Sequence, residues 1–416
     1  MNRLAVVATL AVLLVGLGVA IALTVPWTVL PGAAPHVDIS RDFTRAEVAR
    51  EVAYHSAVRP PAYAGLLIGL AVAGVLALTP LGARVVTGVA KPLGGGFVAQ
   101  VVLGTLVLTV IGRVVTLPFG VLAERVQREY GLSTQTWGSW LLDRAKGIGV
   151  GTVMTSLVLL AVLGLVRLAP RTWWAWAALV TAAFVVVGSF VYPLLVEPVF
   201  NKFTSLPAGQ LRSDLLDMAA RDDVPVKDVL VADASRRTTS LNAYVSGFGS
   251  TRRIVVYDTL IEKATPAEVE LIVAHELGHA KRQDVLYGTL LGALGGAAGV
   301  CALALLLSWT PLLRQAGASS PGDPRVIPLL LFLVAASTLL LGPATNVMSR
   351  RIEARADVHS LDVTHDAPTF ITTEQRLART NLSDLEPNAF LYAMFSTHPT
   401  SPQRIALARE WARLHP

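Results

Sequence analysis

The 416-residue sequence has little charge, a single cysteine and no dense cluster of basic residues. Charged residues make up 15% of it, against about 25% in an average soluble domain, which excludes a soluble multidomain enzyme. Cys301 has no partner for an internal disulfide, so a disulfide scaffold is excluded as well. The net charge of +6 is spread along the chain rather than gathered into a nucleic-acid patch. The excess therefore fits loops that face an anionic membrane leaflet.

Hydrophobic residues make up 53% of the chain, and many stand in runs long enough to cross a bilayer. These runs are rich in Leu, Val and Ala and show no alternation, so they predict helices and not barrel strands. The predicted spans are Leu4–Val25, Ala62–Leu81, Phe97–Leu117, Ile148–Leu168, Trp173–Leu195, Val285–Trp309 and Val326–Val347. The fold class is therefore an all-α polytopic membrane protein with about seven transmembrane helices.

The first run follows a short basic start, as a cleaved signal peptide would. It is longer than a signal core of about 7–15 residues, which favours a retained helix. The loops after the first, third and fifth runs hold more Arg and Lys than the alternate loops. By the positive-inside rule, the N-terminus is outside, the C-terminus is cytoplasmic, and the protein is a multi-pass protein of the cell membrane.

Two polar regions remain on the predicted cytoplasmic side. The first contains a helix-like stretch, 206–221, and two β-rich stretches, 228–232 and 253–257. The second is mostly helical in pattern. The predicted division is 1–195 for five helices and their loops, 196–284 for a small α/β insert, 285–347 for helices six and seven, and 348–416 for a C-terminal helical region.

The segment 275–279 reads His-Glu-Leu-Gly-His and lies on a helix that Thr265 and Pro266 begin. His275 and His279 are four residues apart, so both imidazoles project from one helical face and can bind one tetrahedral zinc ion. Glu276 is rotated by about 100° from His275 and can take a proton from a metal-bound water. The alternative is a polar helical face at the membrane surface with solvated histidines.

A catalytic zinc ion needs a third protein ligand and an open position. Asp284 is expected to continue the same helix, and Asp323 lies in a predicted outer loop. Glu353 is the first acid after the last span on the inner side, so it is the predicted third ligand. Asp357, one turn later, is suited to accept the other N–H of a ligand histidine. The alternative is that both acids are surface charges paired with nearby arginines such as Arg350.

These motifs resemble the type I CAAX prenyl protease family of membrane-embedded zinc metallopeptidases. The likeness covers about residues 40–410. It is carried by the His-Glu-x-x-His segment, the Glu353–Asp357 pair, the stretch 242–247 (Asn-Ala-Tyr-Val-Ser-Gly), and His398-Pro399 with Arg404-Ile405. Shorter similar stretches are 117–119, 197–203 and 381–385.

The resemblance implies a water-filled intramembrane chamber, with the zinc site facing into it. It also implies that 242–247 is an edge strand on which the substrate lies, held at Asn242, Ala243, Tyr244 and Gly247. An ordinary half-buried strand is the alternative. His398 is similar to the family's late histidine near the scissile carbonyl, although it could be a plain loop residue. Arg404 either pairs with an acid near the site or caps a helix.

The predicted function is an integral-membrane zinc metalloendopeptidase with one Zn²⁺ per chain, acting on peptides or proteins and surrounded by membrane lipids. Lipidated or membrane-associated substrates are candidates, and the sequence leaves open whether the natural substrate is prenylated. Its catalytic residues would be Glu276, His398 and Asp357, and no nucleic acid is involved. A membrane quality-control protease of the heat-shock type is one alternative, and a non-catalytic zinc-binding receptor or transporter is another. Arg113 stands inside the third span, where an arginine usually faces a wet interior or an acid, so we expect it to line a chamber.

Overall fold

The computed structural model describes residues 1–32 and 36–416, and most of them are helical. The helices are α1 (Arg3–Thr24), α2 (Ile39–Asp42), α3 (Arg45–Ala77), α4 (Pro80–Ala90), α5 (Phe97–Glu129), α6 (Trp137–Leu168), α7 (Trp173–Val191), α8 (Glu197–Phe200), α9 (Gln210–Arg221), α10 (Asp258–Lys263), α11 (Pro266–Lys281), α12 (Asp284–Leu307), α13 (Thr310–Gln315), α14 (Ile327–Thr364), α15 (Ala367–Asn381), α16 (Ala389–Phe395) and α17 (Ser401–Leu414). The strands are β1 (Phe203–Ser205), β2 (Asp228–Ala232), β3 (Ala243–Ser246) and β4 (Arg253–Tyr257).

Within the described residues, seven helices are long and apolar enough to cross a membrane, which confirms the predicted fold class. They run through α1, α3, α5, α6, α7 with α8, α12 and α14. Several of them exceed the predicted runs: α3 begins at Arg45 and not near Ala62, because a capping box at Thr44 and Glu47 starts the helix in polar sequence. Hydropathy marks only the apolar part of such a helix.

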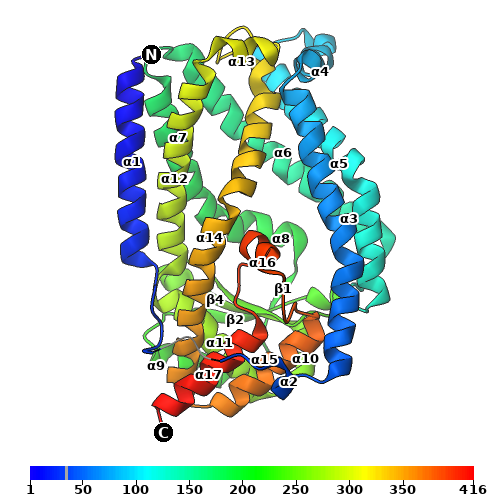
Figure 1. The fold of residues 1–416 in the computed structure, drawn as a ribbon, viewed down its shortest axis with the longest axis vertical. Helices are drawn as coiled ribbons and strands as arrows, with labels where there is room; N and C mark the ends of the chain where they lie inside the picture. Colours follow the sequence, from blue (N-terminus) through cyan, green and yellow to red (C-terminus); the bar gives the residue numbers. More distant parts are fainter. Residues whose placement is uncertain (33–35) are drawn as a thin grey trace.

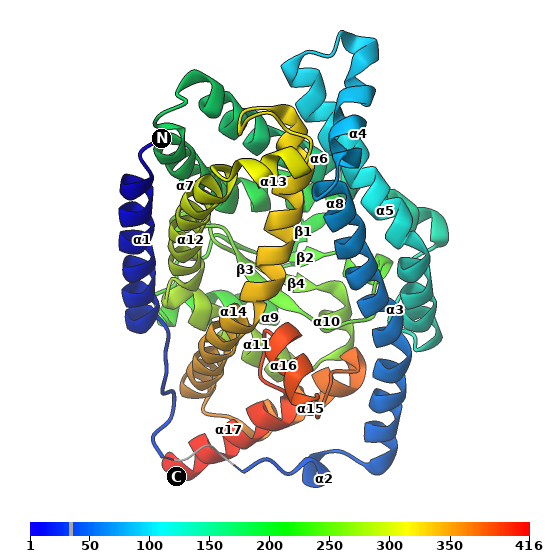
Figure 2. The ribbon, with the colours of Figure 1, turned by 45° about the horizontal axis from the view of Figure 1, so that its top comes forward.

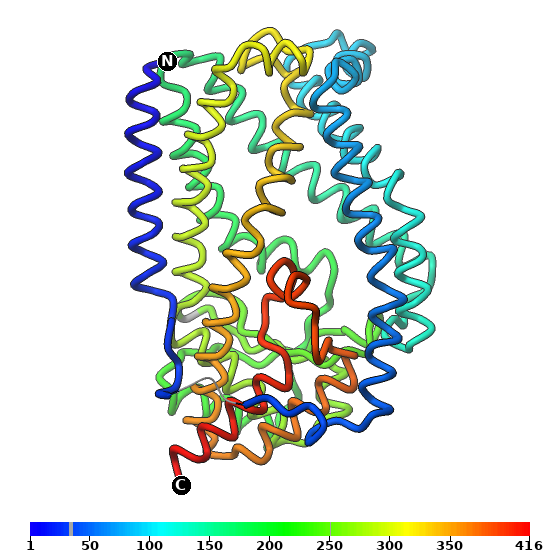
Figure 3. Tube along the Cα trace, in the orientation of Figure 1, coloured from blue at the N-terminus to red at the C-terminus, as the bar shows by residue number. Residues whose placement is uncertain are grey.

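The spanning helices and the polar regions occupy different ends of an elongated molecule (Figure 1). The N-terminus lies at one end with α4 and α13, and the C-terminus lies at the other end with α15 and α17 (Figure 3). The two polar regions, although far apart in sequence, meet at the C-terminal end. Their contact is made mainly by α11 with α14 and α15.

A four-stranded sheet lies in the polar end, in the order β1-β2-β4-β3 (Figure 2). β2 and β4 match the predicted stretches; they pair in parallel and are largely buried because each is rich in valine. β1 and β3 are the antiparallel edge strands. The predicted helix at 206–221 begins later, at Gln210. The sheet packs against α9 and α11, with a core that includes Leu215, Ile254 and Leu277.

Helices α11 and α14 approach each other closely at Gly278. A Cβ atom added at Gly278 would stand 2.8 Å from Cδ2 of His359 on α14, so a larger residue would push the two helices apart. His359 is itself fixed, because its Nε2 lies 2.9 Å from Asp222 Oδ2. This contact sets the spacing of the two helices that carry the candidate site.

Candidate active site

The two histidines of the His-Glu-x-x-His segment face each other on α11. Thr265 and Glu268 form the predicted capping box at the start of this helix, and Pro266 is its first residue. The Nε2 atoms of His275 and His279 stand 3.2 Å apart. Both ring nitrogens can therefore contact the same ion, as the four-residue spacing predicts.

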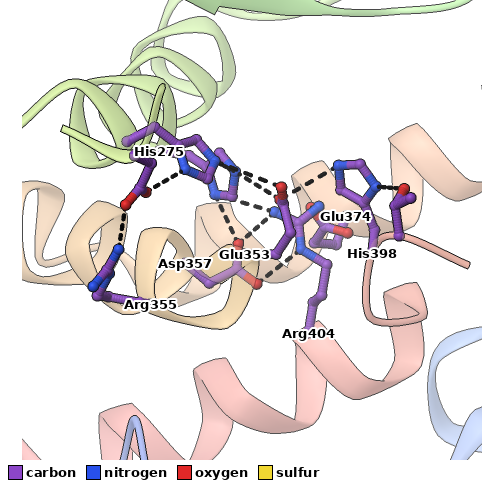
Figure 4. A network of polar contacts seen from close by, with 10 residues as sticks. His275, Glu353, Arg355, Asp357, Glu374, His398 and Arg404 are labelled. Carbon is purple, nitrogen blue, oxygen red and sulfur yellow. Dashed lines mark hydrogen bonds and ion pairs between the residues drawn. The ribbon is translucent and has the colours of Figure 1, made fainter. Parts of the chain in front are cut away.

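Glu353 reaches the same space from α14 (Figure 4). Its Oε2 lies 3.3 Å from His275 Nε2, and its Oε1 lies 3.7 Å from His279 Nε2. One ligand atom from each of these three residues lies within 4.8 Å of the others. The structure therefore brings together two imidazoles and one carboxylate, which is the donor set of many catalytic zinc sites.

The local chemistry of this cluster fits a bound cation. Oε2 of Glu353 is buried and has no hydrogen-bond partner, which is costly for a carboxylate oxygen. Burial lowers the pKa of His275, but its contacts with Asp357 and Glu353 outweigh that effect and raise the pKa to about 10. The cluster thus favours positive charge between its carboxylates, and a divalent metal ion would supply it.

Each histidine has a carboxylate at its other ring nitrogen. Nδ1 of His275 lies 2.9 Å from Oδ1 of Asp357, and Nδ1 of His279 lies 2.9 Å from Oδ2 of Asp284. Such pairs leave both Nε2 atoms free to bind a metal. Contrary to the prediction from the sequence, Asp284 does not continue the same helix, because α11 ends at Lys281 and Asp284 begins α12. Gln283 adopts a left-handed conformation with φ of 56°, which ends α11 and turns Asp284 back toward His279.

Arg404 forms ion pairs with two buried acids, Asp357 and Glu374, next to the two histidines. Its Nε donates to Asp357 at 2.9 Å, and its NH1 lies 2.6 Å from Glu374 Oε1. Of the two alternatives for Arg404, the structure therefore contains the pairing with acids. Glu374 was not predicted from the sequence, because it belongs to no motif. It lies on α15, far along the chain from His275 and His279, and its side chain is buried with 2% exposed.

Glu276 lies between two cavities that meet at the metal-ligand cluster. One has a volume of about 420 Å³ and extends toward Glu374 and Arg404, and the other has a volume of about 740 Å³ and extends along β3. Glu276, Glu353 and His398 line both cavities. Burial raises the pKa of Glu276, although the neighbouring histidines oppose the rise. A carboxylate in this position can exchange protons with a group in either cavity.

The stretch 242–247 forms the free edge of the sheet beside the larger cavity, as predicted for an edge strand. The N–H of Tyr257 donates to the carbonyl of Asn242, so the even positions of β3 form the bonded pairs with β4. The backbone groups of Ala243 and Val245 therefore point away from the sheet. Gly247 has φ of 91° and a Cβ atom there would stand 2.6 Å from the Thr251 carbonyl oxygen, so only glycine fits.

His398 lies in the segment between α16 and α17 and approaches the cluster from the side opposite to α11. Its Nε2 lies 3.4 Å from Glu353 Oε2, and Thr397 Oγ1 lies 2.9 Å from its Nδ1. Its side chain is 60% exposed. The predicted site residues Asn242, Ala243, Tyr244 and Gly247 all line the larger cavity with it.

Comparison with known proteins gives two family matches that together cover most of the chain. Residues 205–412 match the model of peptidase family M48. Residues 43–202 match a model described as the CAAX prenyl protease N-terminal region with five membrane helices. The boundary between the matches falls at β1, where the spanning helices give way to the polar region.

Individual proteins agree with these matches. The chain is 31% identical over 306 residues to an uncharacterized metalloprotease, YhfN, of Bacillus subtilis, covering 73% of this chain and 72% of that protein. It is 28% identical over 299 residues to the CAAX prenyl protease 1 homolog of Arabidopsis thaliana, covering 70% and 69%. Its fold is similar to the crystal structure of S. mikatae Ste24p, with a TM-score of 0.75, 18% identity, and 98% and 99% of the two chains covered.

Proposed function

The chain belongs to peptidase family M48 and is a membrane metallopeptidase; from this premise we propose that it is a zinc endopeptidase acting on lipidated peptides at the cytoplasmic face. The proposed ligands are His275, His279 and Glu353. One observation carries this assignment: the three residues offer ligand atoms within 4.8 Å of one another. Glu353 Oε2 is buried there without a hydrogen bond, although two imidazole nitrogens lie 3.3 and 3.4 Å from it. The chemistry that follows needs one zinc ion per chain.

When bound, zinc lowers the pKa of water and polarises the scissile carbonyl. Glu276 is the proposed base, because it lines both cavities at the cluster. It accepts a proton from the attacking water and passes it to the leaving amine as the C–N bond breaks. Asp357 holds the ring of His275 by accepting from its Nδ1, and Asp284 does the same for His279.

His398 is the proposed hydrogen-bond donor to the scissile carbonyl oxygen, where negative charge develops during attack. Its exposed ring lines both cavities, so it can reach a substrate that passes between them. Burial lowers the pKa of His398, although Glu353 opposes the fall, so the ring is neutral at neutral pH. A neutral imidazole still carries one N–H group, which is enough for a donor.

The substrate would bind as an additional strand beside β3. The outward backbone groups of Ala243 and Val245 can each exchange hydrogen bonds with an extended peptide. Asn242 and Tyr244 line the same cavity and would contact its side chains. An antiparallel peptide on this edge would place its N-terminal side near Gly247 and its C-terminal side in the cavity of Glu374.

We propose that the substrate is lipidated because relatives of this chain are named CAAX prenyl proteases. The proposed orientation has the N-terminus outside and the polar end, with the metal site, toward the cytoplasm of the cell. It is supported by the richer basic loops at that end and by the opposite positions of the two termini (Figure 1).

The test is metal analysis and peptide cleavage by the purified full-length protein. We expect one zinc per chain, cleavage of a farnesylated C-terminal peptide, loss of cleavage with a chelator and recovery with added zinc. Glu353→Ala should abolish stoichiometric zinc. Cleavage that persists without metal would contradict the zinc mechanism. Equal cleavage of farnesylated peptide, plain peptide and unfolded casein would instead contradict the substrate assignment and favour a quality-control protease.

A further inference from the structure

Arg113 and Arg144 lie on two neighbouring spanning helices, and neither has a carboxylate partner among the described residues. Arg113 lies midway along α5 and Arg144 lies near the start of α6, and both side chains are exposed. Across residues 1–32 and 36–416, neither takes part in an ion pair. An unpaired arginine within a membrane span is costly and usually marks a functional site.

Both arginines line one cavity of about 540 Å³ between α5 and α6. Asp143 also lines it, but its carboxylate accepts from Gln135 at 2.7 Å and stands 3.8 Å from Arg237 and 3.9 Å from Lys146. That acid is therefore engaged with other groups. The guanidinium of Arg144 lies 4.3 Å from the ring centre of Trp140, which holds it over the cavity. The cavity keeps an excess of positive charge.

A second cavity of about 630 Å³ adjoins the first, and the two share Arg113 and Thr116. It lies between α3, α5 and α14, and apart from these two residues and Thr109 its lining is apolar. Leu70, Leu331 and Ala335 are typical of that lining. An apolar cavity that adjoins a cavity lined by arginines is complementary to an amphiphile with an anionic head and a hydrocarbon chain.

We propose that these two cavities form a binding site for one anionic phospholipid. Its phosphate group would pair with Arg113 and Arg144, and an acyl chain would fill the apolar cavity beside α14. The phosphate offsets the cost of keeping the Arg113 guanidinium within the predicted third span, and Arg144 lies just before the predicted fourth span. A lipid fits better than the scissile peptide, because neither cavity shares a lining residue with the two cavities at the metal-ligand cluster.

The test is native mass spectrometry of the full-length protein in detergent, titrated with phosphatidylglycerol or with phosphatidylcholine of the same chains. We expect phosphatidylglycerol to be retained preferentially. Arg113→Gln and Arg144→Gln should each weaken its binding roughly fivefold. Arg125→Gln is the matched control, because Arg125 is an exposed arginine on α5 outside both cavities. Ala335→Phe should weaken phosphatidylglycerol binding by filling the apolar cavity.

Several results would overturn the proposal. One is equal retention of the two lipids, and another is an equal effect of Arg113→Gln and Arg125→Gln. Glycerol 3-phosphate competing as well as the whole lipid would indicate a simple anion site. If a farnesylated peptide acid binds to these cavities and phosphatidylglycerol does not displace it, the cavities would be assigned to the substrate. If Arg113→Gln does not fold, Arg144→Gln near the end of its helix decides the question.

Discussion

The polar end and the spanning helices differ in whether their charged side chains are paired. In the polar end, the buried acids Asp42, Asp222, Glu268 and Asp357 each pair with an arginine or lysine of the chain. In the described part of the spanning helices, Arg113 and Arg144 have no such partner. A paired buried charge fixes its neighbours in place, whereas an unpaired charge needs something that the chain does not supply. Glu353 differs from these four acids, because histidines, and not an arginine or a lysine, lie beside its carboxylate.

The largest effect is expected for Glu276→Gln. The variant keeps the three ligand residues, so zinc content should be unchanged, but turnover should fall roughly a thousandfold or more because the base is lost. The measurements are metal analysis and single-turnover cleavage. Glu270→Gln, on the same helix but outside the two cavities at the metal-ligand cluster, should be active. Retained turnover in Glu276→Gln would mean that another group acts as the general base.

The next effect concerns the carboxylates behind the histidines. Asp284→Asn and Asp357→Asn should each weaken zinc binding about 10- to 100-fold, because an amide no longer fixes the imidazole by charge. A competitive chelator titration measures this. Asp217→Asn, an exposed acid on α9, is the control. If neither variant changes zinc affinity, the pairs at Nδ1 are structural only, and the polar end does not position its ligands through charge.

A smaller effect is expected at the edge of the sheet. Val245→Pro removes an N–H group that points away from β4, so the sheet and the zinc should be kept while kcat/KM for a long peptide falls by about tenfold. Tyr244→Pro is the matched comparison, because it removes a group bonded to β4 and should destabilise the protein. Similar behaviour of the two variants in thermal unfolding would contradict the register assigned to β3.

The smallest effect is expected for Glu374→Gln, which tests how far the paired network extends its influence. Arg404 keeps its pair with Asp357, so zinc affinity should fall by less than about tenfold. Glu410→Gln, an acid paired near the C-terminus, is the control. A chelator titration measures the zinc affinity of Glu374→Gln and of the control Glu410→Gln. A loss as large as that of Asp357→Asn would mean that Glu374 and Asp357 act as one unit.

The sequence predicted features that depend on local pattern or on membrane topology. The capping box at Thr265, the two valine-rich strands and the number of spans follow from composition and spacing, and the structure contains them. The proximity of Glu353 was inferred because few acids lie between His279 and the C-terminal region, and Glu353 is the first one after the last predicted span. Its role as a ligand stays a prediction, as do the roles of His398 and the β3 residues.

The missed features depend on backbone conformation and long-range packing. The left-handed Gln283 that redirects Asp284 has no glycine or proline to signal it, so a continuous helix was the reasonable expectation. Glu374 reaches Arg404 only because α15 packs against α11 and α17. No periodicity in the sequence indicates that arrangement.

Helix α14 runs without interruption from the segment after α13 to beyond Glu353, over 38 residues. At about 1.5 Å per residue, it is a rod of roughly 57 Å that carries Glu353 on the same element as the last membrane crossing. Pro343 lies within the predicted crossing, before Glu353, and proline is where long helices bend. Because one helix joins the last membrane crossing to Glu353, the depth at which that helix sits in the bilayer also sets the depth of the carboxylate.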